Sequence, residues 1–261
     1  MLSIDLKGKT AVITGASRGI GKAIAEVFAD AGASLILLSR NKSLLEQVTK
    51  ELNTKYKKPI ANSLVLDVSN PEEVEKTFSK IDSIDILINN AGVHFTSSIK
   101  DMDIEKWKEL LEINLHGAMY CSKFALPKML SKKWGRIINI ASTSGKYGEA
   151  YSGAYCSSKF ALIGFTQSLA NEVAREGITV NAVCPGWTET AMAEGILHDD
   201  TYARLSGISI NKLKEYSLEA VPIGRYVSPY EVAYLTAFLA NNHASAITGQ
   251  AINICGGICM H

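Results

Sequence analysis

The chain has 261 residues, which suits one large domain or two small ones with a substantial core. Its 27 basic and 26 acidic residues leave a formal charge of +1, so no overall field attracts nucleic acid or an anionic membrane. No apolar run approaches the roughly 18 residues of a membrane span, and residues 1–9 lack the apolar stretch of a signal peptide. Five cysteines without a C-x-x-C pair and scattered histidines predict reduced thiols, a cytoplasmic location and no metal site.

Short apolar runs alternate along the chain with stretches whose apolar residues recur at helical spacing. This alternation predicts a single-domain α/β fold of the Rossmann type: a doubly wound parallel sheet of about seven strands with helices on both faces. No repeat or linker divides residues 1–261. Strands are expected at 9–13, 34–38, 63–68 (as a buried strand), 85–88, 136–141, 178–184 and 251–254, and helical patterns at 23–31, 44–57, from 71, at 103–132, 153–175 and 230–240.

The first predicted strand stops at a glycine-rich turn, residues 14–21, and a helical pattern follows. Glycines let a backbone turn tightly and approach a pyrophosphate closely, and a helix N-terminus offers N–H donors and a positive dipole end. The turn is therefore predicted to bind a dinucleotide. Its spacing is G-x-x-x-G-x-G rather than the commoner G-x-G-x-x-G, and a simple tight turn is the alternative interpretation.

The second predicted strand ends in Ser39 and Arg40. An NAD enzyme would be expected to carry an acidic residue there, to bind the ribose 2′-hydroxyl. Two guanidiniums, Arg40 and Arg18 of the glycine turn, together with a hydroxyl suit a 2′-phosphate instead. We therefore predict NADP(H), with solvated surface charges as the alternative.

The carboxyl ends of parallel strands meet at one edge of a sheet, where ligands bind. Asp67 is placed there to accept a hydrogen bond from an adenine amino group, and residues 89–92 are small and polar where bulk would block a cofactor. The residues expected at this edge are Gly15, Ser39, Arg40, Asp67, Asn90, Ser142 and Pro185.

Tyr155 and Lys159 lie one turn apart on a predicted helix. A phenol has a pKa of about 10, and an ammonium beside it favours the phenolate and lowers that pKa. The Ser142 hydroxyl, at a neighbouring strand end, could hold a substrate oxygen beside the phenol. This set predicts a proton-transfer site for a carbonyl/alcohol pair, although Tyr-x-x-x-Lys by itself also arises by chance. Asn114 lies in the middle of the 103–132 pattern, so either it faces water or its amide has a role.

Strand signals disappear between residues 187 and 221, and helix-forming polar pieces replace them. More than thirty residues without a strand in a compact domain predict a substrate lid.

The combined motifs resemble the short-chain dehydrogenase/reductase family over essentially the whole chain. They are Thr14-Gly15-x3-Gly19-x-Gly21, Asn89-Asn90-Ala91-Gly92, Asn114, Ser142, Tyr155-x3-Lys159, Pro185-Gly186, Ile247-Thr248-Gly249-Gln250 and Gly256-Gly257.

The resemblance implies a role for each matching residue. Tyr155 would be the general acid/base and Ser142 would orient the substrate oxygen. Lys159 would lower the Tyr155 pKa and hold the nicotinamide ribose, and Asn114 would anchor a water-mediated proton path. Thr188 by its backbone and Thr190 by its hydroxyl would hold the carboxamide. The implied cofactor site comprises Gly15, Ser17, Arg18, Gly19, Ile20, Gly21, Ser39, Arg40, Asp67, Val68, Asn90, Ala91, Gly92, Tyr155, Lys159, Pro185, Gly186, Thr188 and Thr190.

Within this family the sequence is similar to the ketoacyl and aromatic polyketide ketoreductases. It departs from the latter at residues 93–96, Val-His-Phe-Thr, where those enzymes have a Pro-Gly-Gly run. The resemblance implies NADPH-dependent reduction of a β-ketoacyl thioester or polyketide chain, free or carried on an acyl carrier protein, by a homotetramer. The partly visible basic docking surface would be Lys128, Lys132, Lys133, Arg136 and Arg175, which adjoins the unfavourable Glu176. A solvated helix end is the alternative interpretation of the lysines.

Two other functions stay open. One is a reductase or dehydrogenase of the same fold that acts on a small alcohol, a sugar or a steroid. The other is a non-catalytic nucleotide-binding protein, against which the complete set of Asn114, Ser142, Tyr155 and Lys159 argues.

Overall fold

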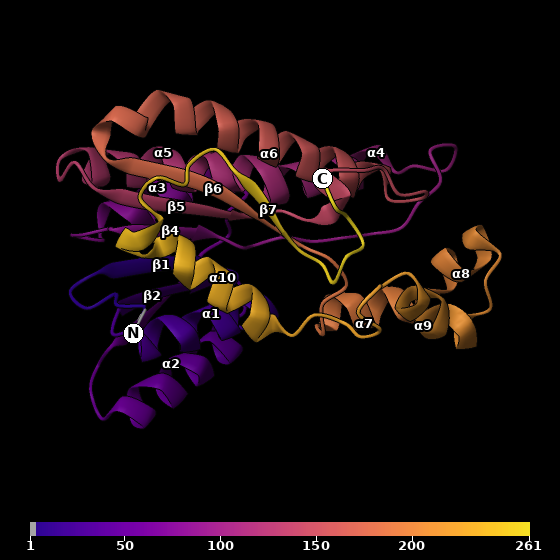
Figure 1. Ribbon diagram of the computed structural model, residues 1–261, viewed down its shortest axis with the longest axis horizontal. Helices are drawn as coiled ribbons and strands as arrows, with labels where there is room; N and C mark the ends of the chain where they lie inside the picture. The colour runs from indigo at the N-terminus through magenta and orange to yellow at the C-terminus, as the bar shows by residue number, and fades with distance from the viewer. Residues whose placement is uncertain (1–3) are drawn as a thin grey trace.

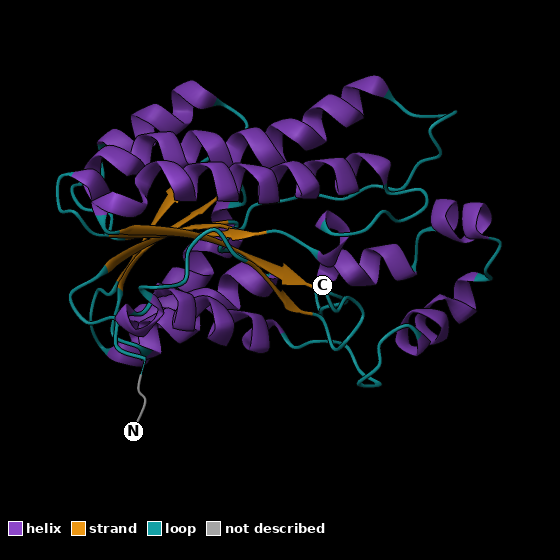
Figure 2. Ribbon diagram, turned by 45° about the horizontal axis from the view of Figure 1, so that its top comes forward, coloured by secondary structure: helices purple, strands orange, loops and turns teal. Residues whose placement is uncertain are grey.

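Seven parallel strands form one sheet, and the computed structural model places helices on both of its faces (Figures 1 and 2). The structure describes residues 4–261, so the first three residues of the segment 1–9 lie outside the described part. The strand order β3-β2-β1-β4-β5-β6-β7 confirms the predicted doubly wound sheet. The strands are β1 (Thr10–Thr14), β2 (Ser34–Ser39), β3 (Ala61–Val65), β4 (Ile86–Asn89), β5 (Gly135–Ile140), β6 (Ile178–Pro185) and β7 (Ala251–Ile254).

The burial of the strands follows their place in the sheet. Every residue of β4, β5 and β6 is buried, as expected for apolar runs covered on both faces. The prediction of a buried strand at 63–68 is wrong, because β3 is an edge strand that ends at Val65, a residue 54% exposed. Asp67 therefore lies in the turn beyond the strand.

Two helical layers cover the sheet, one on each face (Figure 2). Alternate side chains of β1 point to opposite faces, so Ala11 and Ile13 join one core cluster and Val12 joins the other. The first layer consists of α1 (Gly19–Asp30), α2 (Lys42–Tyr56) and α10 (Pro229–Ala240), and the second of α3 (Pro71–Ser79), α4 (Ile104–Leu111), α5 (Gly117–Leu130) and α6 (Gly153–Val173).

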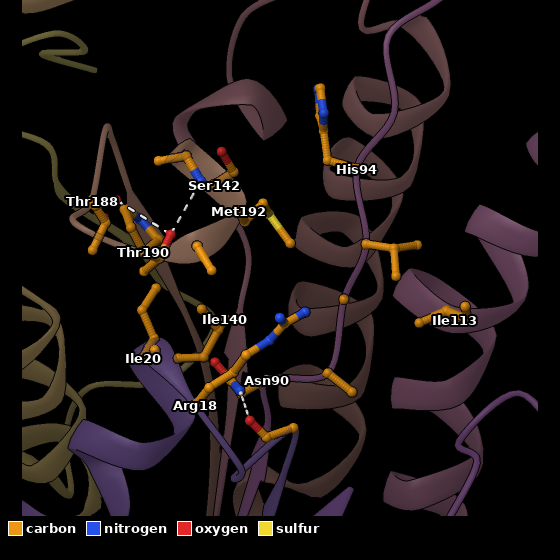
Figure 3. Close-up of a pocket in the computed structure, with 18 of the residues that line it drawn as sticks. Arg18, Ile20, Asn90, His94, Ile113, Ile140, Ser142, Thr188, Thr190 and Met192 are labelled. Carbon is orange, nitrogen blue, oxygen red and sulfur yellow. Dashed lines mark hydrogen bonds between the residues drawn. The ribbon is translucent and has the colours of Figure 1, made fainter. Parts of the chain in front are cut away.

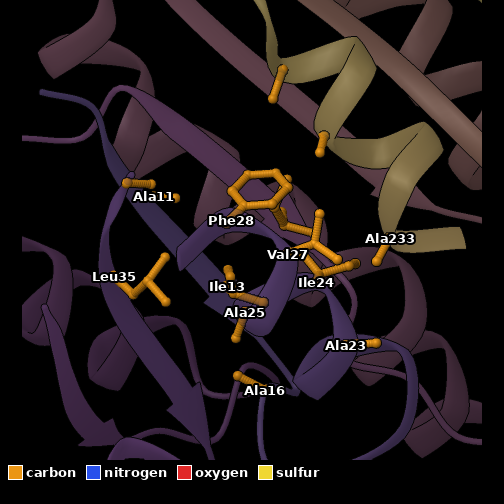
Figure 4. Close-up of a cluster of buried hydrophobic side chains, with 14 of the residues drawn as sticks. Ala11, Ile13, Ala16, Ala23, Ile24, Ala25, Val27, Phe28, Leu35 and Ala233 are labelled. Atoms are coloured by element: carbon orange, nitrogen blue, oxygen red, sulfur yellow. The ribbon is translucent and has the colours of Figure 1, made fainter. Parts of the chain in front are cut away.

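The first helical layer is anchored by α1. Its side chains Ile24, Val27 and Phe28 lie in one buried cluster with Ala233 of α10 (Figure 4). Phe28 is fully buried, and its truncation to alanine would cost about 3–5 kcal/mol. This packing fixes the start of α1 against the end of β1, where the glycine turn lies.

The helical pattern predicted at 103–132 forms a run of helix without a break over residues 104–130, but this run is not α-helical throughout. It divides into α4, a π-helical turn at Glu112–His116, and α5. Turns of this kind hold an extra residue and are frequent at functional sites. Asn114, in the middle of the turn, is only 1% exposed and so faces the protein interior.

Residues 187–221 lie outside the two layers and contain α7 (Ala191–Leu197), α8 (Asp200–Ser206) and α9 (Ile210–Glu219), at the right of Figure 1. They have a small core of their own, in which Leu197, Leu213 and Val221 cluster with Tyr226. Trp187 stacks on Tyr226 with ring centroids 5.9 Å apart, which ties the first residue of this segment to the chain just after its end. In the described part of the chain, no helix is long and apolar enough to span a membrane.

Candidate active site

A cavity of about 420 Å³ opens at the carboxyl edge of the sheet. All seven residues expected at the strand ends line it. So do the other predicted catalytic and cofactor residues, except two. Gly21 instead packs against the glycine turn, where an added Cβ would lie 2.3 Å from the Gly15 carbonyl oxygen. Asn114 lies behind the wall of the cavity.

The ends of β1 and β4 are fastened together beside the cavity. Thr14 Oγ1 accepts hydrogen bonds from the backbone N–H groups of Asn90 (2.9 Å) and Ala91 (3.0 Å). Asn90 Nδ2 donates to the backbone oxygens of Thr14 (3.0 Å) and Gly15 (3.2 Å), and Figure 3 shows the Asn90 side chain in this position. Gly15 has φ +65°, and an added Cβ would come within 2.8 Å of Asn90 Nδ2, so the turn requires glycine here.

The N-terminus of α1 offers an anion site that fits a pyrophosphate. The N-cap residue, Arg18, makes no side-chain capping bond, which leaves N–H groups of the first turn free. The helix dipole adds positive potential there. Gly19 has φ +55°, a conformation that residues with a side chain rarely adopt, so the start of the helix favours glycine here.

Polar and charged groups gather at the end of β2. The hydroxyl oxygens of Ser17 and Ser39 lie 2.9 Å apart. Arg40 Nη1 is 3.6 Å from Asp67 Oδ2, and the Arg40 side chain is 55% exposed, so the guanidinium is accessible at the cavity rim. The other Asp67 oxygen accepts hydrogen bonds from the backbone and hydroxyl of Ser69. Arg18 also lines the cavity, and it lines a neighbouring pocket together with His94 and Met192.

Ser142, Tyr155 and Lys159 line the opposite end of the cavity. Ser142 follows β5, and its Oγ accepts a hydrogen bond from the Ser144 backbone N–H at 3.1 Å. Tyr155 and Lys159 belong to the first two turns of α6. Lys159 is 4% exposed, its Nζ donates to the Ile140 carbonyl oxygen at 2.8 Å, and it lies 5.5 Å from the centroid of the Tyr155 ring.

Burial dominates the acidity of these groups. It raises the pKa of Tyr155 to about 12, while the neighbouring Ser142 hydroxyl acts in the opposite direction. Burial also lowers the pKa of Lys159 to about 8. In the chain alone, the direction of the Tyr155 shift is therefore opposite to the one predicted from its spacing with Lys159. The reason is that desolvation of the phenol outweighs the ammonium, which points its hydrogen bond at Ile140.

Asn114 connects the loop after β4 to α6. Its Oδ1 accepts the Val93 backbone N–H at 2.8 Å, and its Nδ2 donates to the Val93 carbonyl (2.9 Å) and to Ser158 Oγ (3.2 Å). An added Cβ on Gly92 would lie 3.3 Å from Asn114 Oδ1 and 3.7 Å from Lys159 Nζ. The Asn114 amide therefore ties this loop to α6, and both the amide and the Lys159 ammonium lie beside Gly92.

Thr188 and Thr190 lie where β6 leads into α7. Thr190 caps this helix, since its Oγ1 accepts the Ala193 N–H at 3.3 Å and donates to the Thr188 carbonyl at 3.3 Å (Figure 3). Thr188 forms an isolated parallel bridge with Val227. These contacts hold the turn between β6 and α7 in place at the cavity.

The fold and this geometry agree with the comparisons. A family model described as short chain dehydrogenase matches residues 9–201. The chain belongs to the short-chain dehydrogenase/reductase family. It is an oxidoreductase that acts on a ketone/alcohol pair, and the family binds a nicotinamide cofactor.

Three relatives show which members of the family this chain is similar to. The 3-oxoacyl-(acyl-carrier-protein) reductase FabG of Aquifex aeolicus is 37% identical over 98% of this chain and 100% of its own length. The Escherichia coli enzyme of the same name is 38% identical over 98% and 100%. A variant of actinorhodin polyketide ketoreductase, solved with NADPH, matches with a TM-score of 0.91 and 37% identity over 99% of each chain.

The sequence did not single out several residues of the reductase that also line the cavity. His94 lies with its ring edge toward Tyr155, the centroids being 5.0 Å apart, and its Nε2 is 3.3 Å from Ser152 Oγ. The departure from the family pattern at residues 93–96 could have drawn attention to His94. Nothing in the sequence of the loop before Tyr155 indicated that its residues line the cavity. The residues missed are His94, Ser144, Tyr147, Glu149, Trp187, Met192 and Ile196.

The predicted basic docking surface needs correction. Arg136 is 2% exposed, lies 4.5 Å from the Trp134 ring centroid, and donates to the Gly135 carbonyl, so it is a buried structural residue. Lys132 pairs with Asp85 at 2.7 Å. Lys132 lies between α5 and β5, and Arg136 lies near the start of β5, so both are at the amino edge of the sheet, whereas the cavity lies at the carboxyl edge.

Proposed function

We propose that this oxidoreductase uses NADPH to reduce a β-ketoacyl thioester or polyketide ketone, free or bound to an acyl carrier protein, to a secondary alcohol. The observation that supports it is one cavity with Arg40, beside the end of β2, at one end and Ser142, Tyr155 and Lys159 at the other; Arg18 also lines this cavity. A dinucleotide with an added phosphate suits the first end, and a reacting carbonyl suits the second.

The chain would hold the cofactor by groups spread along the cavity. The free N–H groups at the start of α1 would bind the pyrophosphate, and Arg18 and Arg40 the 2′-phosphate. Lys159 would hold the nicotinamide ribose, and Thr188 and Thr190 the carboxamide. When bound, the nicotinamide supplies a hydride to the carbonyl carbon.

Tyr155 would give its phenolic proton to the carbonyl oxygen. A pKa of about 12 keeps the phenol protonated at neutral pH, which is the state that an acid needs in the direction of reduction. Ser142 would donate a hydrogen bond to the same oxygen and stabilise the charge that develops on it. Lys159, with a pKa of about 8, could return a proton to Tyr155, and Asn114 would hold the path through which solvent supplies it.

The substrate assignment rests on the relatives, two of which are named as reductases of acyl-carrier-protein substrates and one as a polyketide ketoreductase. The exposed Lys133 and Arg175 and the half-buried Lys128 remain as a docking surface for a carrier protein. Residues 187–221 would act as the lid, and the chain would form a homotetramer, which light scattering tests.

The experiment is NADPH oxidation, with NADH in parallel, against a panel of ketones. The panel contains the N-acetylcysteamine thioester of acetoacetate, a simple cyclic ketone, a keto sugar and a steroid ketone. We expect the highest kcat/KM for the thioester with NADPH. A preference for one of the others would assign the alternative substrate class, and binding of NADPH without turnover of any would favour a non-catalytic nucleotide-binding protein.

A further inference from the structure

Glu149 is the one carboxylate among the described residues that line the cavity near Tyr155. It belongs to the loop 146–152 that precedes α6. Ser144 and Tyr147 line the same wall. The proposed reaction assigns Glu149 no role, and within residues 4–261 it forms no ion pair.

The backbone fixes Glu149 next to the reacting groups. Its N–H donates to Cys156 Sγ at 3.4 Å, and its carbonyl accepts the Ser152 N–H at 3.3 Å. Tyr151 in the same loop has φ +66°, a conformation that bulky residues rarely adopt, and its carbonyl accepts the Ser97 N–H at 2.9 Å. Such backbone strain persists where the surroundings hold it and is common at ligand clamps.

Within the described residues, Glu149 forms an ion pair with none of the positive charges around the cavity. The lysines and arginines that line the cavity within residues 4–261 are Arg18, Arg40 and Lys159. Arg40 lies 3.6 Å from Asp67, and Lys159 donates to the Ile140 carbonyl. Lys146, in the same loop as Glu149, also donates to a backbone carbonyl, that of Ala251. His94 is neutral at pH 7, because burial lowers its pKa to about 4.

Glu149 is exposed at the wall of the cavity, so a substrate can reach its carboxylate. The protein atoms around the carboxylate raise the Glu149 pKa, although hydrogen bonds from Ser144 and Tyr147 lower it. Its charge in turn is one of the causes that raise the pKa of Tyr155 and Tyr202. A substrate group that donates a hydrogen bond would therefore be favoured at this wall, and a second negative charge would not.

We propose that Glu149 sets substrate specificity: its carboxylate accepts a hydrogen bond from an N–H or O–H group of a neutral ketone and disfavours ketones that carry a carboxylate. This inference rests on the proposed function, since the ketone must first be a substrate. An amide N–H in the arm of a thioester is a donor of the required kind.

Three substrates that share the acetoacetyl group separate hydrogen bonding from charge. The N-acetylcysteamine thioester is neutral and has an amide N–H, ethyl acetoacetate is neutral and lacks such a donor, and acetoacetate is an anion. Each is tested with the wild type and Glu149→Gln, which keeps the shape and removes the charge. Glu172→Gln, an exposed residue near the other end of α6, is the matched control.

We expect Glu149→Gln to lower kcat/KM for the thioester by about tenfold and raise it for acetoacetate by about tenfold, because a charged acceptor is replaced by a neutral one. Ethyl acetoacetate should change less than about twofold, and Glu172→Gln should change none of the three. NADPH affinity and the melting temperature of both variants verify the fold.

Equal factors for all three substrates would overturn the inference, because they would show that Glu149 acts on the reaction or the fold rather than on selection. A wild type that reduces none of the three would instead contradict the proposed function. Glu149→Leu serves as a second variant if Glu149→Gln is unstable, with the same substrate pattern expected.

Discussion

The two halves of the cavity are built differently. The nucleotide half consists of strand ends, a glycine turn and a helix N-terminus, and much of its recognition would come from backbone groups that Thr14 and Asn90 hold in place. The substrate half consists of side chains on loops and on short helices, such as His94, Glu149 and Met192. Backbone geometry is shared by a whole family, whereas loop side chains can change without disturbing the sheet. The first half therefore indicates the cofactor class and the second the individual substrate.

The largest expected effect falls on the chemistry where the two halves meet. Tyr155→Phe should bind NADPH normally and reduce its ketone at least about 10²-fold more slowly, because the proton donor is lost. Fluorescence titration and steady-state kinetics measure the two quantities. Tyr234→Phe, on a residue of α10 that is 57% exposed, is the control. Near-normal turnover of Tyr155→Phe would remove the phenol from the mechanism.

In the substrate half, the pH dependence of protein stability tests whether burial keeps His94 neutral. Burial lowers its pKa from 6.5 to about 4, so between these values the unfolded chain binds a proton that the folded protein does not. Stability is thus lost as the pH falls from about 6.5 to 4, by up to about 3 kcal/mol. His94→Asn should reduce this loss by the same amount in urea titrations at pH 7 and pH 4.

The control for this measurement is His243→Asn, at an exposed position. It should keep the wild-type dependence on pH. If His94→Asn also keeps it, the ring of His94 is not held neutral by its surroundings.

Thr14 tests the nucleotide half. Thr14→Val removes the acceptor of the Asn90 and Ala91 N–H groups, and the free energy of unfolding should fall by about 2 kcal/mol. NADPH binding should weaken as well, since the strand ends separate. Thr10→Val, at the other end of β1, is the control in urea unfolding. A Thr14 variant as stable as this control would show that the two strand ends are held by other contacts.

The smallest expected effect concerns the choice of cofactor. Arg40→Asp should lower the ratio of kcat/KM with NADPH to that with NADH by about tenfold, since a carboxylate repels a 2′-phosphate. Lys42→Asp makes the same charge change two residues away, where the side chain pairs with Glu46. Equal selectivity in wild type and Arg40→Asp would place the recognition of the 2′-phosphate elsewhere.

The sequence predicted the sheet because its strands are local apolar runs and its glycine turn is a local motif. The strand ends then had to meet at one edge, and Gly15, Asn90 and Ser142 do line one cavity. The sequence pattern could not predict which residues the complete fold would bury or expose. The edge position of β3 and the burial of Arg136 depend on neighbours that are distant in sequence.

The candidate site shows the same division. Spacing placed Tyr155 and Lys159 on one helix, but it did not reveal that desolvation dominates the phenol pKa. Glu149 reaches the cavity through a loop held by contacts to Cys156 and Ser97, which no periodicity encodes. The period of an α-helix likewise gave no sign of the extra residue around Asn114.

The extra residue in this π-helical turn sets how α5 is rotated about the helix axis relative to α4. If one residue of Glu112–His116 were deleted, a regular helix would form, but everything beyond it would turn by about 100°. Either Asn114 would then leave Val93 and Ser158, or the apolar face of α5 would leave the sheet. We therefore expect an insertion or deletion in this short segment to disrupt the protein, even though the segment lies within a run of helix that has no break.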